Sequence, residues 1–177
     1  DKVLILKKTG SQLHNELFSL IRQHSLPFQY VPVEKLNRLT KKNHQGVVAY
    51  ISPVPYYPLD EIVMRCFDSG KEPFILILDQ ITDIGNFGAI ARSAECMGVD
   101  VIVIPEKGSA SINADAVKIS AGALLRVPVS KVSSLKKSVE YLRNSGIKIF
   151  AGTEKAEVDA GEAILTGPVA IIAGSED

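Results

Sequence analysis

The stretch FILILDQITDIGNFGAIARSAECMG, residues 74–98, decides the fold of this protein. It begins with the apolar run FILIL, which is typical of a strand buried on both faces of a parallel sheet. A turn with Gly85 and Gly88 follows, and then a helix predicted over residues 87–97 that carries one basic residue, Arg92. A buried strand, a glycine-containing turn and a helix in this order predict the first unit of an α/β domain.

Strands and helices continue to alternate after this stretch. The hydrophobic periodicity predicts strands at residues 99–104, 126–129, 147–152 and 168–174 and helices at residues 113–121 and 133–144. Several of these strands are apolar throughout, so we expect a parallel sheet covered by helices on both faces. Parallel sheets bind their ligands at the carboxyl ends of the strands. The turn after residue 79 is therefore the first place where we expect a site.

The beginning of the chain has a different organisation. Its pattern predicts strands at residues 2–8 and 28–33, a helix at residues 11–25 capped by Ser11, and a short helix, a basic turn and a last strand within residues 33–51. A proline-rich stretch, SPVPYYPLDE (52–61), then interrupts both kinds of element. We expect a small α/β domain over residues 1–53, a linker with a short helix over 54–72 and a second domain over 73–177.

The charge is unevenly distributed along the chain. The whole protein has 20 basic and 20 acidic residues, but residues 1–53 contain eight basic residues and only three acidic ones. Lysine and arginine contacts to phosphate supply most of the affinity for nucleic acid that does not depend on sequence. The candidate RNA contacts are Lys7, Lys8, Arg38, Lys41 and Lys42. A basic face that is only solvated is the alternative.

Composition argues against several other classes of protein. No apolar run approaches the ~20 residues that would cross a bilayer, and no signal peptide opens the chain, so we expect a cytoplasmic protein. Cys66 and Cys96 lack a CxxC partner and the histidines are scattered, so we expect neither a disulfide nor a metal site. The chain begins without Met and ends on the strand and turn IIAGSED (171–177), so we expect that residues are missing on both sides.

Helical geometry divides the residues of the predicted helix between two faces. At 100° per residue, one broad face that we expect to be buried contains Phe87, Ile90, Ala91, Ala94 and Met97. Gly88, Arg92 and Glu95 fall on another face. We therefore expect Arg92 to point away from the core, beside a glycine that leaves the backbone open to close approach.

The residues around this turn have more than one interpretation. Asn86 lies where an N-cap belongs and Gly98 where the residue after a helix belongs, and capping alone would explain both. Arg92 could be a surface residue paired with Glu95 or Asp83. The glycines Gly85 and Gly88 are spaced G-x-x-G, and the chain contains no G-x-G-x-x-G, which weakens the hypothesis of a dinucleotide-binding oxidoreductase.

The turn and helix resemble the first motif of the SpoU-type, or TrmH-like, RNA 2′-O-ribose methyltransferases of the SPOUT superfamily, in the pattern Asp83-x-x-Asn86-x-Gly88-Ala89-Ile90-x-Arg92-x-Ala94-x-x-x-Gly98. KISAGALLRVPV (118–129) and IIAGSE (171–176) are similar to the next segments of that family. NHQGVVAYI (43–51) is similar to the end of the small RNA-binding domain that precedes the catalytic domain in many members. The resemblance covers nearly the whole chain.

The resemblance implies a fold, a cofactor and a set of site residues. The fold is a parallel-sheet α/β catalytic domain with a trefoil knot, preceded by a small α/β domain that binds the RNA substrate. The cofactor is S-adenosylmethionine, and the active site lies at the subunit interface of a homodimer. The implied catalytic residues are Arg92, Asn86 and Glu176, and the implied cofactor contacts are Thr153, Gly174, Ser175 and Glu176.

The chain also departs from the pattern of the family. Ile84 takes the place of the proline that usually follows the motif Asp, and Asp177 takes the place of the glycine after the second-motif Glu. The third motif, which contains Ser-Leu-Asn, is not present in these residues. A catalytically silent RNA-binding dimer is therefore an alternative to the enzyme. For the enzyme, a guanosine of large-subunit (23S) ribosomal RNA is the first expected substrate and a tRNA guanosine the second.

The chemistry of the reaction favours one role for Arg92. A guanidinium stays protonated at neutral pH, which makes it a poor general base. It can instead stabilise the alkoxide that develops on the ribose oxygen and orient a neighbouring phosphate. We expect Asn86 and Glu176 to fix its side-chain conformation.

Overall fold

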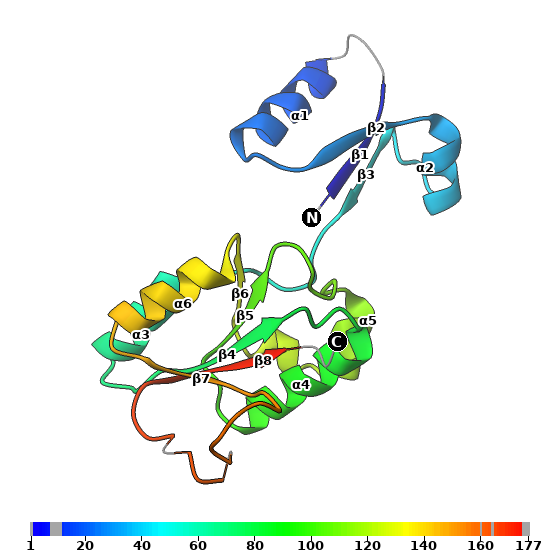
Figure 1. Cartoon of the computed structure of the whole chain (residues 1–177). Helices are drawn as coiled ribbons and strands as arrows, with labels where there is room; N and C mark the ends of the chain where they lie inside the picture. Colours follow the sequence, from blue (N-terminus) through cyan, green and yellow to red (C-terminus); the bar gives the residue numbers. More distant parts are fainter. Residues whose placement is uncertain (1, 8–11, 160, 164, 175–177) are drawn as a thin grey trace. The chain divides into compact units, whose positions relative to one another are not determined.

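The computed structural model describes residues 2–7, 12–159, 161–163 and 165–174 (Figure 1). The chain divides into two units, Asp1–Ser52 and Pro53–Asp177. Ser11, the predicted helix cap, lies outside the described residues. The predicted domain limits 1–53, 54–72 and 73–177 stay predictions.

The small unit is an α/β sandwich. Its described elements are β1 (Lys2–Leu6), α1 (Gln12–Gln23), β2 (Phe28–Val31), α2 (Val33–Leu39) and β3 (Val47–Tyr50). The strands form a sheet in the order β2-β1-β3, in which β2 is parallel and β3 antiparallel to β1. The sheet lies between the two helices because its residues alternate between two apolar faces.

Each helix of the small unit covers one face of this sheet. On one face, Leu36 of α2 is completely buried against Leu4 and Val31. On the other face, Phe18 of α1 packs against Phe28, with ring centroids 5.3 Å apart in an edge-to-face arrangement. The side chains of β2 therefore pack in two separate apolar layers, one on each face of the sheet.

The large unit contains a parallel sheet. Its described elements are α3 (Leu59–Asp68), β4 (Phe74–Asp79), α4 (Ile84–Cys96), β5 (Val101–Pro105), α5 (Ala114–Ile119), the 3-10 helix η1 (Ala123–Leu125), β6 (Val129–Val132), α6 (Leu135–Asn144), β7 (Lys148–Ala151) and β8 (Val169–Gly174). The strand order is β6-β5-β4-β8-β7, and every neighbouring pair is parallel. The prediction of an α/β domain with a parallel sheet is confirmed, and the knot stays a prediction.

Helices cover both faces of this sheet (Figure 1). On one face, Ile75, Ile77, Val101 and Val103 pack with apolar residues of α3 and α6. On the other face, the strand residues that alternate with these four pack with α4, α5 and η1. Burial on both faces explains why the strands are apolar throughout.

The strand order reverses direction between β4 and β8. From β4 the chain moves outward to β5 and β6, and it then crosses to β7 at the opposite edge before β8 fills the position beside β4. Such a reversal is a topological switch point, and open α/β sheets bind ligands outside the carboxyl ends of the strands at this point. The fold thus places the turn after Asp79 beside the end of β8.

Two predicted elements have different bounds in the structure. Helix α4 begins at Ile84, three residues before the predicted start, because Asp83 caps it. Strand β6 is Val129–Val132, whereas the prediction was 126–129. The apolar residues before β6 belong instead to η1 and to the turn through Pro128, which has no N–H to donate to a sheet.

The predicted buried face of α4 is partly wrong. Phe87, Ala91 and Ala94 are buried as expected, but Met97 is 67% exposed. Met97 is the C-cap residue, and Gly98, with a φ of +76°, turns the chain away after it. The prediction for Gly98 is confirmed, because the left-handed conformation that ends the helix favours glycine.

Gly88 has a structural role that differs from the predicted one. It is buried, and a Cβ at this position would lie 2.7 Å from Ile119 Cγ2 and 3.2 Å from the backbone nitrogen of Ser120. The end of α5 therefore fills the space beside Gly88, where the sequence suggested that a ligand could approach the backbone. A glycine is needed here because the two helices pack closely.

We expect Gly88→Ala to lower the free energy of unfolding by about 1–2 kcal/mol. Overpacking costs about 1–3 kcal/mol, and the better helix propensity of alanine offsets less than ~1 kcal/mol of this. Urea denaturation measures the effect. The double variant Gly88→Ala/Ile119→Ala removes the nearest atom, Ile119 Cγ2, and should recover part of the loss. Equal stability of Gly88→Ala and the wild type would contradict the close packing of α4 on α5.

Candidate active site

The turns after β4 and β7 and the last residue of β8 meet at the carboxyl edge of the parallel sheet, and we call these three segments the three turns. Asp79, the last residue of β4, pairs with Gly174, the last residue of β8. On the other side of β8, Ala151 pairs with Ile172, and the backbone nitrogen of Gly152 donates to the carbonyl of Ile172 at 3.0 Å. The register thus brings the end of β4 close to the ends of β7 and β8, which lie about 75 and 95 residues further along the chain.

Three predicted site residues that the structure describes lie at or next to these turns. Asn86 follows β4, Thr153 follows β7 and Gly174 ends β8. Ser175 and Glu176 lie outside the described residues, so their predicted roles stay predictions. The structure brings Thr153 and Gly174, the described members of the predicted cofactor set, to one edge of the sheet.

Asp83 is the N-cap of α4, and the prediction that Asn86 has this position is wrong. The carboxylate oxygen Oδ1 of Asp83 accepts a hydrogen bond from the backbone nitrogen of Asn86 at 2.7 Å. An aspartate cap also places negative charge at the positive end of the helix dipole. Asn86 is exposed in the first turn, so its side chain is not used as the cap.

At the ends of β7 and β8, no side chain of the described residues lies within 4 Å of the position of a Cβ built on Gly152 or Gly174. Gly152 and Gly174 are both exposed, and a Cβ at Gly174 would have its nearest contact at 4.0 Å. Half-buried apolar side chains, those of Ile84 and Ala173, pack against the nearby core. Thr153 Oγ1 accepts a hydrogen bond from the backbone nitrogen of Lys155 at 3.3 Å and shapes the turn. This edge can accept a ligand that needs backbone hydrogen bonds and an apolar surface.

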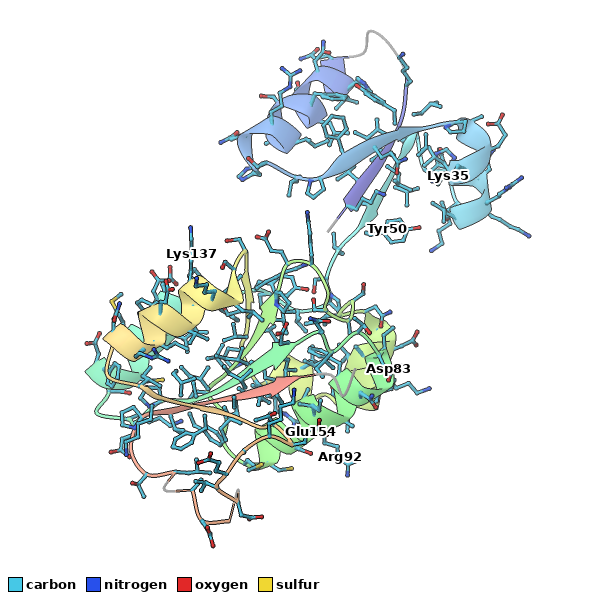
Figure 2. The ribbon with its side chains drawn as sticks, viewed as in Figure 1. Lys35, Tyr50, Asp83, Arg92, Lys137 and Glu154 are labelled. Carbon is cyan, nitrogen blue, oxygen red and sulfur yellow. The ribbon has the colours of Figure 1, made fainter. Side chains whose placement is uncertain are left out.

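Arg92 is exposed on α4 (Figure 2) and lies about 1.7 turns of helix beyond Asn86. Six residues of α-helix separate the two, which places their side chains about 120° apart around the axis. Neither alternative partner binds Arg92: Glu95 forms an ion pair with Arg126, and Asp83 caps the helix. Among the described residues, the Arg92 guanidinium has no hydrogen bond or ion pair. The structure of one chain thus does not bring Arg92 to Asn86.

The candidate RNA contacts of the small unit are exposed. Lys7 follows β1, Arg38 lies in the last turn of α2, and Lys41 and Lys42 lie in the turn after it. Within the part of the chain that the structure describes, none of these four forms an ion pair. Lys8 lies outside the described residues.

The groups with shifted pKa values lie away from the three turns. Burial raises the pKa of the Cys66 thiol, and a hydrogen bond to Asp100 raises the pKa of Lys71. Lys71 and Asp100 come just before β4 and β5, at the amino ends of the strands. A thiol with a raised pKa at that edge is not an activated nucleophile.

Other kinds of site are few in the described part of the chain. The described residues contain no group of three or more His, Cys, Asp and Glu that could hold a metal ion. No helix in the described part of the chain has the length and apolar character to cross a membrane. A cavity of about 480 Å³ lies at the end of β6 and the start of α6, lined in part by Lys131, Ser134 and Lys137. This cavity does not include the residues of the three turns.

The fold and the position of the site define a class: a parallel α/β protein with a ligand-binding edge at a topological switch point, joined to a small basic unit. Residues 73–177 match the model of the SpoU rRNA methylase family, and residues 1–57 match the model for RNA 2′-O ribose methyltransferase substrate binding. This chain therefore belongs to the SpoU methylase family, and the resemblance seen in the sequence is confirmed.

Relatives in bacteria support the family assignment. YacO of Bacillus subtilis, which carries the name of a TrmH-family tRNA/rRNA methyltransferase, is 30% identical over 175 residues, which cover 99% of this chain and 70% of the relative. A relative of the same family from Staphylococcus saprophyticus is 34% identical over 181 residues, which cover 99% of this chain and 71% of the relative.

Solved structures share the fold. The SpoU methyltransferase AviRb from Streptomyces viridochromogenes, in complex with AdoMet, is 22% identical with a TM-score of 0.59 and aligns with 99% of this chain. The AdoMet-bound rRNA methyltransferase from Sinorhizobium meliloti is 16% identical with a TM-score of 0.59 and also aligns with 99% of this chain. This chain spans 65% and 64% of the length of these two structures.

The cap of α4 can be tested by substitution. We expect Asp83→Ala to lower the free energy of unfolding by about 1 kcal/mol, since the first turn of α4 loses the acceptor for Asn86 N–H. Asp83→Asn keeps a side-chain acceptor and should change stability by a few tenths of a kcal/mol. Chemical denaturation compares the variants. An equal loss in both would show that the carboxylate charge matters more than the hydrogen bond.

Proposed function

We propose that this protein is an S-adenosylmethionine-dependent RNA methyltransferase that methylates a ribose 2′-hydroxyl. One observation carries the proposal: a single chain matches both the SpoU methylase model and the RNA substrate-binding model of 2′-O ribose methyltransferases. The meeting of the turns after β4, β7 and β8 at a switch point supports it. In this proposal residues 1–53 bind RNA and residues 73–177 transfer the methyl group.

Thr153, Gly174, Ser175 and Glu176 are the proposed cofactor contacts. The exposed backbone at Gly174 and the apolar surface beside it fit a ligand that combines polar ends with an apolar body. When bound, S-adenosylmethionine supplies an electrophilic methyl group on a positively charged sulfur. The residues of the three turns orient the ligand and exclude water from the reacting atoms.

Arg92 is proposed to stabilise the negative charge that develops on the ribose oxygen. A guanidinium has only hydrogen-bond donors, so Arg92 does not accept the 2′-hydroxyl proton, which leaves to solvent or to the neighbouring phosphate. The same fork of donors can bind a neighbouring phosphate in a bidentate manner. Asn86 and Glu176 complete the proposed catalytic set.

The position of Arg92 makes a second copy of the chain part of the proposal. The carboxyl edge of the sheet lies at the start of α4, and Arg92 is eight residues into the helix, about 12 Å along its axis. Arg92 of one copy would therefore act on the ribose held at the turns of its partner. A homodimer with a shared site satisfies this requirement.

Ribosomal RNA is the proposed substrate class, and tRNA is the second candidate. The relatives are named for both RNAs, and the Sinorhizobium meliloti neighbour is named as an rRNA methyltransferase. We propose a guanosine of large-subunit (23S) RNA as the first choice. The cytoplasmic location stays a prediction.

We expect Arg92→Ala to lose methyl transfer by a factor of about 100 or more, because a charge-stabilising donor of this kind contributes about 10²–10³ to the rate. Binding of S-adenosylmethionine, measured by calorimetric titration, should change less than about 2-fold, since Arg92 is not among the proposed cofactor contacts. Transfer of a radioactive methyl group to total RNA measures activity. Unchanged turnover would remove Arg92 from the mechanism. A wild-type protein that binds RNA but not the cofactor would favour the silent RNA-binding dimer.

A mixing experiment tests whether Arg92 acts across the dimer. Arg92→Ala and Gly174→Val each remove one part of the proposed site, and both should be inactive alone. Random exchange of subunits should restore roughly a quarter of wild-type activity, because one site in each mixed dimer is intact. Mixed protein that stays inactive after proven subunit exchange would place Arg92 and Gly174 of the same copy in one site.

A further inference from the structure

We propose that Tyr50 is a stacking platform for an unpaired RNA base, with Lys2 and Arg38 binding the phosphates on either side of it. We call this set, together with the exposed Leu39, the Tyr50 surface. The inference rests on the proposed function, since that function assigns RNA to the small unit. It specifies which face of the unit binds RNA and that the RNA there is single-stranded.

The register of the small sheet places Tyr50 on the face that α2 covers. Leu4 pairs with Val48 and Lys2 with Tyr50 across the antiparallel strands β1 and β3. Leu4 and Val48 pack with Leu36 of α2, so Lys2 and Tyr50, two residues further along each strand, point to the same side. Directly opposite side chains in such a pair are about 5 Å apart at their Cβ atoms, which brings the Lys2 ammonium within reach of anything bound on the ring.

Helix α2 lies on the same face of the sheet as Tyr50. β2 runs parallel to β1 and ends at Val31, opposite Leu6, and only Pro32 separates it from α2. The helix packs on this face through Leu36, which contacts Leu4 and Val31. Arg38 and Leu39 lie in the last turn of α2, and both are exposed.

The Tyr50 ring is available for a ligand. It is 49% exposed, and it contacts no other aromatic ring among the described residues (Figure 2). Leu39 is also exposed, at 44%. An exposed aromatic ring with an apolar neighbour and flanking cations has the features of proteins that bind single-stranded nucleic acid, where bases stack on rings and the backbone follows positive charge.

The opposite face of the same sheet is a less suitable platform. Tyr30 is similarly exposed, at 46%, but its ring stacks on Phe18 with centroids 5.7 Å apart and meets Phe28 edge to face. These rings contact one another and fill the space under α1. Tyr30 is therefore a matched control: the same residue type with similar exposure on a strand of the same sheet.

Charge favours RNA as the occupant of the Tyr50 surface. The small unit has eight basic residues against three acidic ones, and Lys2 and Arg38 form no ion pair among the described residues. An acidic protein partner would use the cations but would not need an exposed ring. A duplex would also use the cations, but its bases are stacked inside the helix and cannot reach the ring.

The full chain can be tested with a fluorescein-labelled 12-nucleotide RNA single strand and with the blunt duplex of the same sequence. Tyr50→Ala should weaken binding of the single strand about 10-fold, within the range that stacking on one ring contributes. Tyr50→Phe and Tyr30→Ala should each change the affinity less than about 2-fold, and duplex binding should not change with any of the three. The urea midpoint of each variant controls for folding.

Salt dependence separates the ring from the cations. Tyr50→Ala removes no charge, so the slope of log affinity against log salt should stay the same. Arg38→Gln should reduce that slope by about 1. An unchanged affinity for Tyr50→Ala together with a reduced slope for Arg38→Gln would overturn the stacking proposal and leave the RNA-binding function intact.

A tryptophan reporter gives an independent measurement. The chain contains no Trp, so Tyr50→Trp introduces a single emitter. The single strand should quench its emission, and the same RNA should leave the emission of Tyr30→Trp unchanged. Equal quenching at both positions would overturn the assignment of the face. Absence of RNA binding by the wild type would overturn both this proposal and the RNA-binding part of the function, whereas cofactor titration would still test the large unit.

Discussion

The candidate site depends on the pairing of β8 with β4. Six pairs of residues, from Phe74 with Val169 to Asp79 with Gly174, join these strands in parallel. This pairing requires the chain to return from β7 into the middle of the sheet, and the return creates the switch point. Without it, the turn before α4 and the end of β8 would lie on separate parts of the molecule. The chemistry proposed here therefore depends on a contact between segments that are far apart in sequence.

Close packing of α4 on α5 holds Arg92, the second part of the candidate site, in place. Gly88 lets α4 approach Ile119 and Ser120 at the end of α5, and Ser120 is completely buried there. The same helix starts at the Asp83 cap, on the edge of the sheet. α4 is thus held at one end by its cap and along its length by α5. The residues on its exposed face, among them Arg92, keep a fixed position relative to the turns of the same copy.

Local patterns in the sequence predicted much of the fold, because strands buried on two faces are apolar throughout and amphipathic helices repeat every 3.6 residues. The position of Gly98 followed from the backbone conformation that ends a helix. The role of Gly88 could not be predicted, since a glycine that allows contact with a ligand and one that allows contact with a helix look the same in sequence. The cap at Asp83 was missed because Asn86 is an equally good capping residue and local pattern does not distinguish them. Strand order, which creates the site, depends on long-range pairing that no local pattern contains.

The acidic residues near Arg92 bind other groups, and this supports the role proposed for Arg92. Residues 74–177 contain thirteen acidic and ten basic residues, so an acidic partner for an arginine is common in this unit. Yet Glu95 binds Arg126, and Asp83 binds the backbone of its own helix. A guanidinium that a neighbouring carboxylate already binds has fewer donors left for an external anion. By engaging these carboxylates elsewhere, the fold leaves the Arg92 guanidinium without an ion pair among the described residues, which suits its proposed contact with the substrate oxygen and a neighbouring phosphate.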